Sequence, residues 1–63
     1  MGILVITCKE RHPRTNQLIE MVSHGVDMDT GRNVVLQSEP LQNVIKAWGL
    51  VYSEEEGEYY IPD

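Results

Sequence analysis

An unbroken apolar run near the start of the sequence, Ile3-Leu4-Val5-Ile6, constrains the fold more than any other feature. The run is rich in β-branched residues, is too short for a helix and is followed by polar residues, so it predicts a strand from Gly2 to Cys8. Successive side chains of a strand point to opposite faces of a sheet, and a run without polar alternation therefore predicts cover on both faces. We expect this strand to lie centrally in its sheet or to pair across a subunit boundary.

The clearest helix signal lies in the second half of the chain. Four apolar residues recur at the spacing that places them on one side of a helix; they are Leu41, Val44, Ile45 and Trp48. Ser38-Glu39-Pro40 supplies a capping side chain, an acidic residue at the positive end of the helix dipole and a proline that the first turn tolerates. Gly49 accepts the left-handed conformation that ends many helices. These features predict an amphipathic helix.

The segment from Gln17 to Met28 supports two interpretations. A helix would begin at a Thr15 cap and end at Gly25. A strand would place alternate apolar residues on one face, which Glu20 and His24 interrupt. Neither pattern is clean, and residues 17–25 alone leave the choice between strand and helix open.

The residues that follow favour the strand. Asp29-Thr30-Gly31-Arg32 is a turn sequence between β-rich arms, and Gly31 supplies the positive φ angle that such a turn needs. We therefore predict a long strand from about Leu18 to Met28 that pairs with a strand from Asn33 to Gln37. The preceding residues, Lys9 to Asn16, are expected to form a loop, because the proline within them lacks a backbone donor.

A second hairpin pattern closes the chain. Ser53 to Gly57 separates Leu50-Val51-Tyr52 from Glu58-Tyr59-Tyr60-Ile61, and Pro62 ends the last strand. Together the elements follow the order β-β-β-α-β-β. We predict a single α+β domain over residues 1–63, a small antiparallel-type sheet of about five short strands with one amphipathic helix.

The length of the chain limits its core. A chain of 63 residues, with 41% apolar and 24% charged residues, should fold around a thin core. Proteins this small usually gain further stability from disulfides, a metal or self-association. Cys8 is the only cysteine, so no disulfide can form within the chain, and the sequence favours a homodimer. The lone cysteine also favours a cytoplasmic protein, and no apolar run approaches the roughly 18 residues of a membrane span.

Charge is unevenly distributed along the sequence. Ten acidic residues against five basic ones give a net charge of −5, which disfavours nucleic-acid binding. Lys9, Arg11 and Arg14 lie near the start, whereas the end is crowded with Glu54, Glu55, Glu56, Glu58 and Asp63. This separation is either ordinary solvated surface or a means of docking through complementary charge.

No group of residues predicts catalysis, a metal site or a cofactor. Cys8, His12 and His24 are too few for a structural zinc site, which needs four ligands. Cys8 ends an apolar strand, where burial raises the pKa of a thiol and keeps it unreactive. The acidic run from Glu54 to Glu58 matches no calcium-loop spacing. We therefore do not expect an enzyme, and we predict no catalytic, cofactor-binding or metal-ligating residues.

Aromatic and acidic side chains are the candidate contacts with a partner, because Trp and Tyr are enriched in binding hot spots. The candidates are Trp48, Tyr52, Tyr59 and Tyr60, together with Glu54, Glu55 and Glu56. Trp48 is expected in the core or in a dimer seam. Tyr59 and Tyr60 point to opposite faces of a regular strand, so we expect one of them to be exposed.

These observations favour a small protein-interaction or regulatory module that acts through a sheet edge or through its aromatic and acidic surface. An alternative rests on the last third of the chain, where the helix, Gly49-Leu50-Val51-Tyr52, an acidic turn and Tyr59-Tyr60-Ile61 resemble the recognition helix and wing of winged-helix proteins. That resemblance implies nucleic-acid binding, although Glu54 to Glu56 stand where phosphate contact needs Lys or Arg. A third hypothesis is an acidic mimic of nucleic acid that inhibits a DNA-binding protein.

Overall fold

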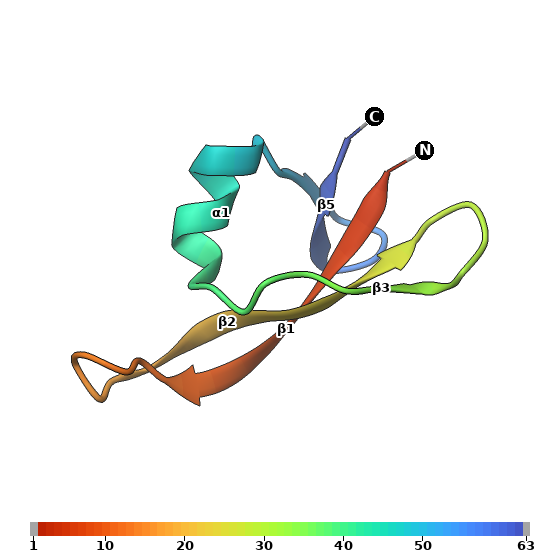
Figure 1. The fold of residues 1–63 in the computed structure, drawn as a ribbon. Coiled ribbons are helices and arrows are strands. Elements are labelled where there is room, and N and C mark those ends of the chain that lie inside the picture. The colour runs from red at the N-terminus through yellow and green to blue at the C-terminus, as the bar shows by residue number, and fades with distance from the viewer. Residues whose placement is uncertain (1, 63) are drawn as a thin grey trace.

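The computed structural model describes residues 2–62, which form a five-stranded antiparallel sheet and one short α-helix (Figure 1). In chain order the elements are β1 (Ile3–Arg11), β2 (Leu18–Asp27), β3 (Asn33–Val34), α1 (Leu41–Trp48), β4 (Val51–Ser53) and β5 (Glu58–Ile61). Within the sheet the strands lie in the order β3-β2-β1-β5-β4. The α+β class and the element order predicted from the sequence are confirmed.

The long hairpin of β1 and β2 shows that the ambiguous segment is a strand. The two strands pair antiparallel along the whole length of β1. The expected loop from Lys9 to Asn16 is wrong over its first three residues, because residues 9–11 pair with residues 18–20. Most of these residues are exposed on both faces, so the strands continue there without an apolar pattern that would have marked them in the sequence.

A β-bulge divides this hairpin into two parts. The register shifts between Ile6 and Thr7, which leaves Ser23 opposite no residue of β1. Bulges bend the strand and increase its local twist. Beyond the bulge, residues 7–20 extend away from the rest of the molecule as a two-stranded ribbon, which we call the arm (Figure 1).

β3 is shorter than the predicted strand from Asn33 to Gln37, because its pairing with β2 ends after two residues. The chain then returns to β2 further along. The Val22 N–H donates a hydrogen bond to the Glu39 carbonyl at 2.8 Å, and Met21 forms a bridge with Pro40. The residues before α1 are therefore held in an extended conformation beside β2.

This extended segment explains why the expectation that Ser38 caps the helix is wrong. α1 begins at Leu41 with Pro40 in the N-cap position, no side-chain cap hydrogen bond and no acidic residue in its first turn. The Pro40 carbonyl accepts a hydrogen bond from the Asn43 N–H at 3.0 Å. The end of the helix is as predicted, since Gly49 has a φ of 62°. Within residues 2–62, no helix has the length and apolar character needed to cross a membrane.

α1 packs on the face of the sheet to which Val5 points. The fully buried side chains are Val5, Val22 and Val44, and Met21 and Leu50 complete the set of buried hydrophobic residues. Partly buried residues surround the central cluster; they are Leu36, Leu41, Ile45, Trp48, Tyr59 and Ile61. With five buried hydrophobic side chains in residues 2–62, the core is thin, as the sequence predicts.

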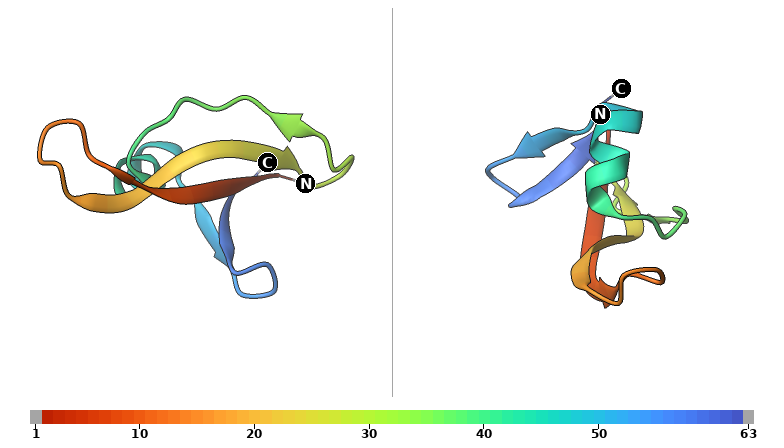
Figure 2. Two further views of the ribbon diagram at one scale, coloured as in Figure 1. Left: turned by 90° about the horizontal axis from the view of Figure 1, so that it is seen from below. Right: turned by 90° about the vertical axis from the view of Figure 1, so that its left-hand side faces the viewer.

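β4 and β5 form a second hairpin, which joins β1 through two residue pairs, Ile3↔Ile61 and Leu4↔Tyr60. Figure 2 shows this hairpin leaning away from the ribbon of β1 and β2. Gly2 permits the close approach of β5, because a Cβ atom at this position would collide with the backbone carbonyl of Ile61. The two ends of the described chain consequently lie side by side (Figure 1).

Candidate protein-interaction surface

β1 is the central strand of the sheet, which is one of the two positions expected from the sequence, but α1 covers only one of its faces. Directly paired residues of an antiparallel sheet share a face. Leu4 pairs with Val26 and with Tyr60, and Tyr60 pairs with Val51. Ile6 follows Leu4 on the same side of β1. We call the surface opposite α1 the open face and define it by its apolar residues Leu4, Ile6, Val26, Val51 and Tyr60; the half-buried His24, which pairs with Ile6, lies on the same face.

The open face presents apolar side chains to solvent. Val51, on the edge strand β4, is 42% exposed, and the other four residues are half-buried. A hollow of about 200 Å³ opens on this face; it is lined by Leu4, Val26, Asp27, Met28, Gly31 and Glu56. The open face thus has an apolar floor with carboxylates at its border.

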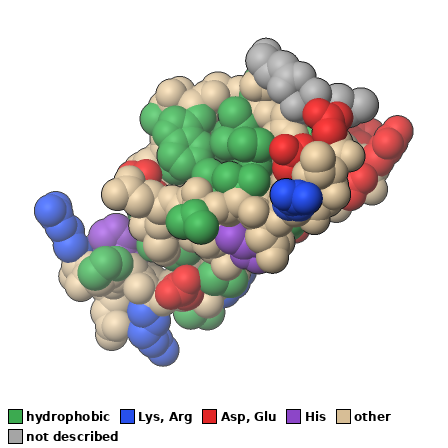
Figure 3. All heavy atoms as spheres, turned by 45° about the vertical axis from the view of Figure 1, so that its right-hand side comes forward, with side chains coloured by type: hydrophobic (Ala, Val, Ile, Leu, Met, Phe, Trp, Pro, Cys, Tyr) green, Lys and Arg blue, Asp and Glu red, His purple; other side chains and the backbone are tan. Residues whose placement is uncertain are grey.

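Two turns that are distant in the sequence meet at this hollow, namely the turn after β2 and the turn between β4 and β5. Acidic side chains gather around them (Figure 3), and we call this region the acidic end: Asp27, Asp29, Glu54, Glu55, Glu56 and Glu58. Both turns are fixed by side chains. Asp27 Oδ1 accepts hydrogen bonds from the N–H groups of Asp29 (2.8 Å) and Thr30 (3.3 Å), and Ser53 Oγ accepts one from the Glu56 N–H (3.3 Å). Asp63 lies outside the described residues.

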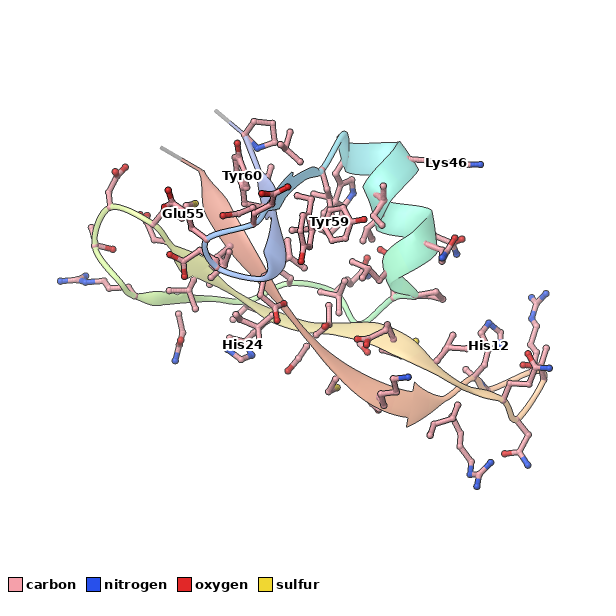
Figure 4. The ribbon with its side chains drawn as sticks, turned by 180° about the vertical axis from the view of Figure 1, so that it is seen from behind. His12, His24, Lys46, Glu55, Tyr59 and Tyr60 are labelled. Atoms are coloured by element: carbon pink, nitrogen blue, oxygen red, sulfur yellow. The ribbon has the colours of Figure 1, made fainter. Side chains whose placement is uncertain are left out.

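The arm carries the basic residues expected near the start of the chain, Lys9, Arg11 and Arg14. The molecule measures 36 Å along its longest axis and 20 Å across. Figure 4 shows His12 at the tip of the arm and Glu55 toward the opposite end, and most basic and most acidic side chains separate accordingly in Figure 3. The charge separation seen along the sequence is therefore also a separation in space.

The tip of the arm is an ordered turn. The His12 N–H donates to the Gln17 carbonyl, and the Asn16 N–H donates to the His12 carbonyl, both at 2.8 Å. Arg11 Nη1 donates to the Asn16 carbonyl at 3.0 Å, and the Arg14 N–H donates to His12 Nδ1 at 3.1 Å. These bonds hold the basic tip in one conformation although the residues around it are exposed.

The four aromatic residues predicted to contact a partner lie on both sides of the β4–β5 hairpin. Trp48 and Tyr59 are half-buried against the core, and Tyr52 stacks edge-on against Tyr59 with ring centroids 5.1 Å apart. Tyr60 lies on the other side of the strand, on the open face (Figure 4). The expectation that Tyr59 or Tyr60 is exposed is wrong, because neighbouring strands and the core bury both by half. The exposed tyrosine is Tyr52, at 52%.

The structure brings together some of the residues singled out from the sequence and adds others. Tyr60 and Glu56 belong to the same surface, and the glutamates beside Glu56 extend it. Sequence reasoning missed the apolar floor around Leu4 and Val26 and the contribution of Asp27 to the acidic end. The apolar run at the start of the chain carried a signal for the floor, because Leu4 and Ile6 alternate with residues that face the core.

Cys8 is half-buried on the arm. Its Sγ donates a hydrogen bond to Glu10 Oε2 at 3.0 Å. This hydrogen bond raises the pKa of the Cys8 thiol, and partial burial and the negative charges of Glu10 and Glu20 raise it further. The expected direction of the pKa is confirmed, but its main cause is the neighbouring carboxylate. At neutral pH the thiol is protonated and a poor nucleophile.

The two histidines have separate local roles. His12 holds the turn at the tip of the arm, and His24 Nδ1 lies 3.1 Å from Ser23 Oγ. Within residues 2–62, no group of three His, Cys, Asp or Glu side chains is placed to hold a metal ion.

A second hollow, of about 440 Å³, opens between the arm and the start of α1. It is lined by His12, Ile19, Glu20, Pro40, Leu41, Gln42 and Asn43. Its lining includes two ionisable side chains and no serine, threonine, cysteine or lysine, as far as the described residues go.

No protein-family model matches the chain, and neither a curated protein nor a solved structure is significantly similar to it.

Proposed function

We propose that this chain is a protein-interaction module that acts through the open face, and that its partner there is a second copy of itself. One observation carries the proposal: β1 is apolar toward both faces of the sheet, whereas α1 covers one of them. Apolar surface removed from water contributes roughly 25 cal/mol per Å², so covering the open face is favourable.

The thin core supports self-association. Five hydrophobic side chains are buried in the described part of the chain. A single core of this size supplies roughly 3–5 kcal/mol of net stability, and Cys8 has no partner for a disulfide within the chain. A second copy that binds only the folded chain would stabilise it by mass action.

The total accessible surface also supports a partner. The chain exposes 4632 Å², whereas a compact monomer of 7.2 kDa exposes about 4100 Å². The difference, about 500 Å², is a large part of the roughly 800 Å² that each protein contributes to a stable interface.

Sedimentation velocity from micromolar to millimolar protein tests the proposal. We expect the unmodified chain to dimerise, and we expect Val51→Gln to weaken dimerisation about tenfold, because burying a valine contributes roughly 1.5 kcal/mol or more. Val51 is already exposed in the single chain, so the far-UV circular dichroism of the variant should be unchanged.

Val35→Gln is the matched control. Val35 is 97% exposed and lies outside the open face, so the same substitution should leave the dimer intact. A chain that stays monomeric throughout the concentration range would contradict the proposal. So would equal weakening of the dimer by the two variants.

The other functional hypotheses remain predictions. The acidic end is the surface that an acidic mimic of nucleic acid would use, and salt-sensitive binding to a basic protein would support that role. The winged-helix hypothesis gains no support from residues 2–62, which contain one helix where a helix-turn-helix needs two.

A further inference from the structure

The two ends of the molecule carry opposite charge. The acidic end contains six carboxylates and, in the turn after β2, one basic residue, Arg32. The tip of the arm, from Arg11 to Gln17, contains two arginines and no acidic residue, whereas the part of the arm nearer the core carries Lys9, Glu10 and Glu20. The arm and the acidic end lie at opposite ends of a molecule that is 36 Å long (Figure 3). This distribution is complementary to a reversed copy of the same molecule.

We propose that two copies pair antiparallel across the open face, with the arm of each chain docked on the acidic end of the other. The inference rests on the proposed function and adds the orientation of the two copies and the contact that fixes it. A two-fold axis makes the two docking contacts identical. The hollow joins the acidic end to the apolar floor of the open face, so an arm docked there also covers that floor.

The arm has the chemistry and the order that this docking needs. Arg11 and Arg14 are exposed, and a guanidinium group can donate two parallel hydrogen bonds to a carboxylate. The hydrogen bonds of the tip fix its backbone before docking, which reduces the conformational entropy lost on binding.

A second copy offers opposite charge to both the arm and the acidic end at once, whereas other charged partners match only one of them. A nucleic-acid backbone would match the tip of the arm, but the acidic end and the net charge of −5 would repel it. A basic protein would match the acidic end and leave the arm without a counterpart. The open face between the two ends then supplies the apolar part of the same interface.

Charge reversal on each partner surface tests the inference. Arg14→Glu and Glu55→Lys should each weaken homodimerisation about tenfold, because each places like charges together in both contacts. Mixing the two variants should restore dimers as heterodimers, since the reversed arm meets the reversed acidic end and the other contact is unmodified. Native mass spectrometry of isotopically labelled chains counts homodimers and heterodimers. Dimerisation of the unmodified chain should also weaken as the Debye length falls from about 10 Å at 0.1 M salt to about 3 Å at 1 M.

Lys46→Glu is the matched control, because it changes the net charge by the same amount as Arg14→Glu but lies on α1, away from the arm (Figure 4). It should leave the dimer unchanged. A dimer that is insensitive to salt and to both reversals would overturn the antiparallel docking and leave the proposed function standing, whereas a monomeric unmodified chain would overturn both. Binding of labelled duplex DNA that Arg14→Glu abolishes, with the dimer intact, would assign the arm to nucleic acid and overturn the inference.

Discussion

The two faces of the sheet are built from similar residues and differ in what covers them. Val5 and Leu4 are neighbours in β1; Val5 is fully buried in the cluster that includes Val44 of α1, whereas Leu4 is half-buried and lines the hollow of the open face. A chain with one short helix can cover one face of a five-stranded sheet. An apolar strand alone therefore does not reveal whether its second face is covered by the same chain or by another.

An aspartate introduced on the face covered by α1 and an aspartate introduced on the open face should differ most in their effects on folding. Val5→Asp should unfold the chain, because an unpaired buried charge costs several kcal/mol, which is as much as the roughly 3–5 kcal/mol of net stability expected at this size. Leu4→Asp should leave the chain folded and prevent dimerisation. Far-UV circular dichroism and sedimentation separate the two results. Unfolding by both substitutions would show that the two faces are equally necessary for folding and would end the distinction.

Trp48→Ala should cost about 3 kcal/mol, the low end of the range for a truncated core tryptophan, because Trp48 is half-buried against the core. Urea denaturation measured at several protein concentrations gives this value. A loss of stability that is the same at every concentration places Trp48 in the core of one chain. A loss that grows with concentration would place it in a dimer seam, the other position that the sequence allowed.

Asp27→Ala should cost about 1 kcal/mol, because the N–H groups of Asp29 and Thr30 lose their side-chain acceptor. The turn that borders the open face would then be less ordered. Asp27→Asn keeps an acceptor oxygen and removes the charge, so its stability in urea should stay close to that of the unmodified chain. Equal destabilisation by both variants would mean that the charge, and not the hydrogen bonds, holds this border.

The smallest effect concerns the Cys8 thiol. The hydrogen bond to Glu10 raises the pKa of the thiol, so Glu10→Gln should lower that pKa and speed alkylation by iodoacetamide near pH 8. The folded chain keeps a proton that the unfolded chain has lost just above the ordinary thiol pKa. The associated stability is therefore complete below that pH and decreases above it.

Glu20→Gln is the control for Cys8, because Glu20 makes the weakest of the contributions to the raised pKa. Its effect on the alkylation rate should be smaller than that of Glu10→Gln. If alkylation of Cys8 becomes slower at high protein concentration, this would indicate that the arm is covered in the dimer. A rate unchanged by either substitution would contradict the assigned role of Glu10.

Local features of the fold could be predicted because the signals lie within a few residues. The helical spacing that ends at Trp48 predicted α1, and Gly31 and Gly49, with φ angles of 77° and 62°, correctly marked the turn after β2 and the end of the helix. The helix start was mispredicted because Pro40 and the residue before it are held by distant β2.

The candidate surface was harder to predict than the fold, because it depends on contacts between distant parts of the chain. Asp27 and Glu56 border one hollow only because the second hairpin folds back to β1. The polar strands of the arm gave no apolar periodicity, so the sequence predicted a loop where β1 continues to Arg11. The sequence shows the run of glutamates and the basic stretch. Only the sheet topology shows that they lie at opposite ends of the molecule.

The joint between β1 and β5 consists of two residue pairs and links the two ends of the chain. Each hairpin forms from residues close in sequence, whereas Ile3↔Ile61 and Leu4↔Tyr60 close a loop of nearly the whole chain. Closing a long loop costs more entropy than closing a short one, and two residue pairs offset little of that cost. We therefore expect the hairpins to form before they join.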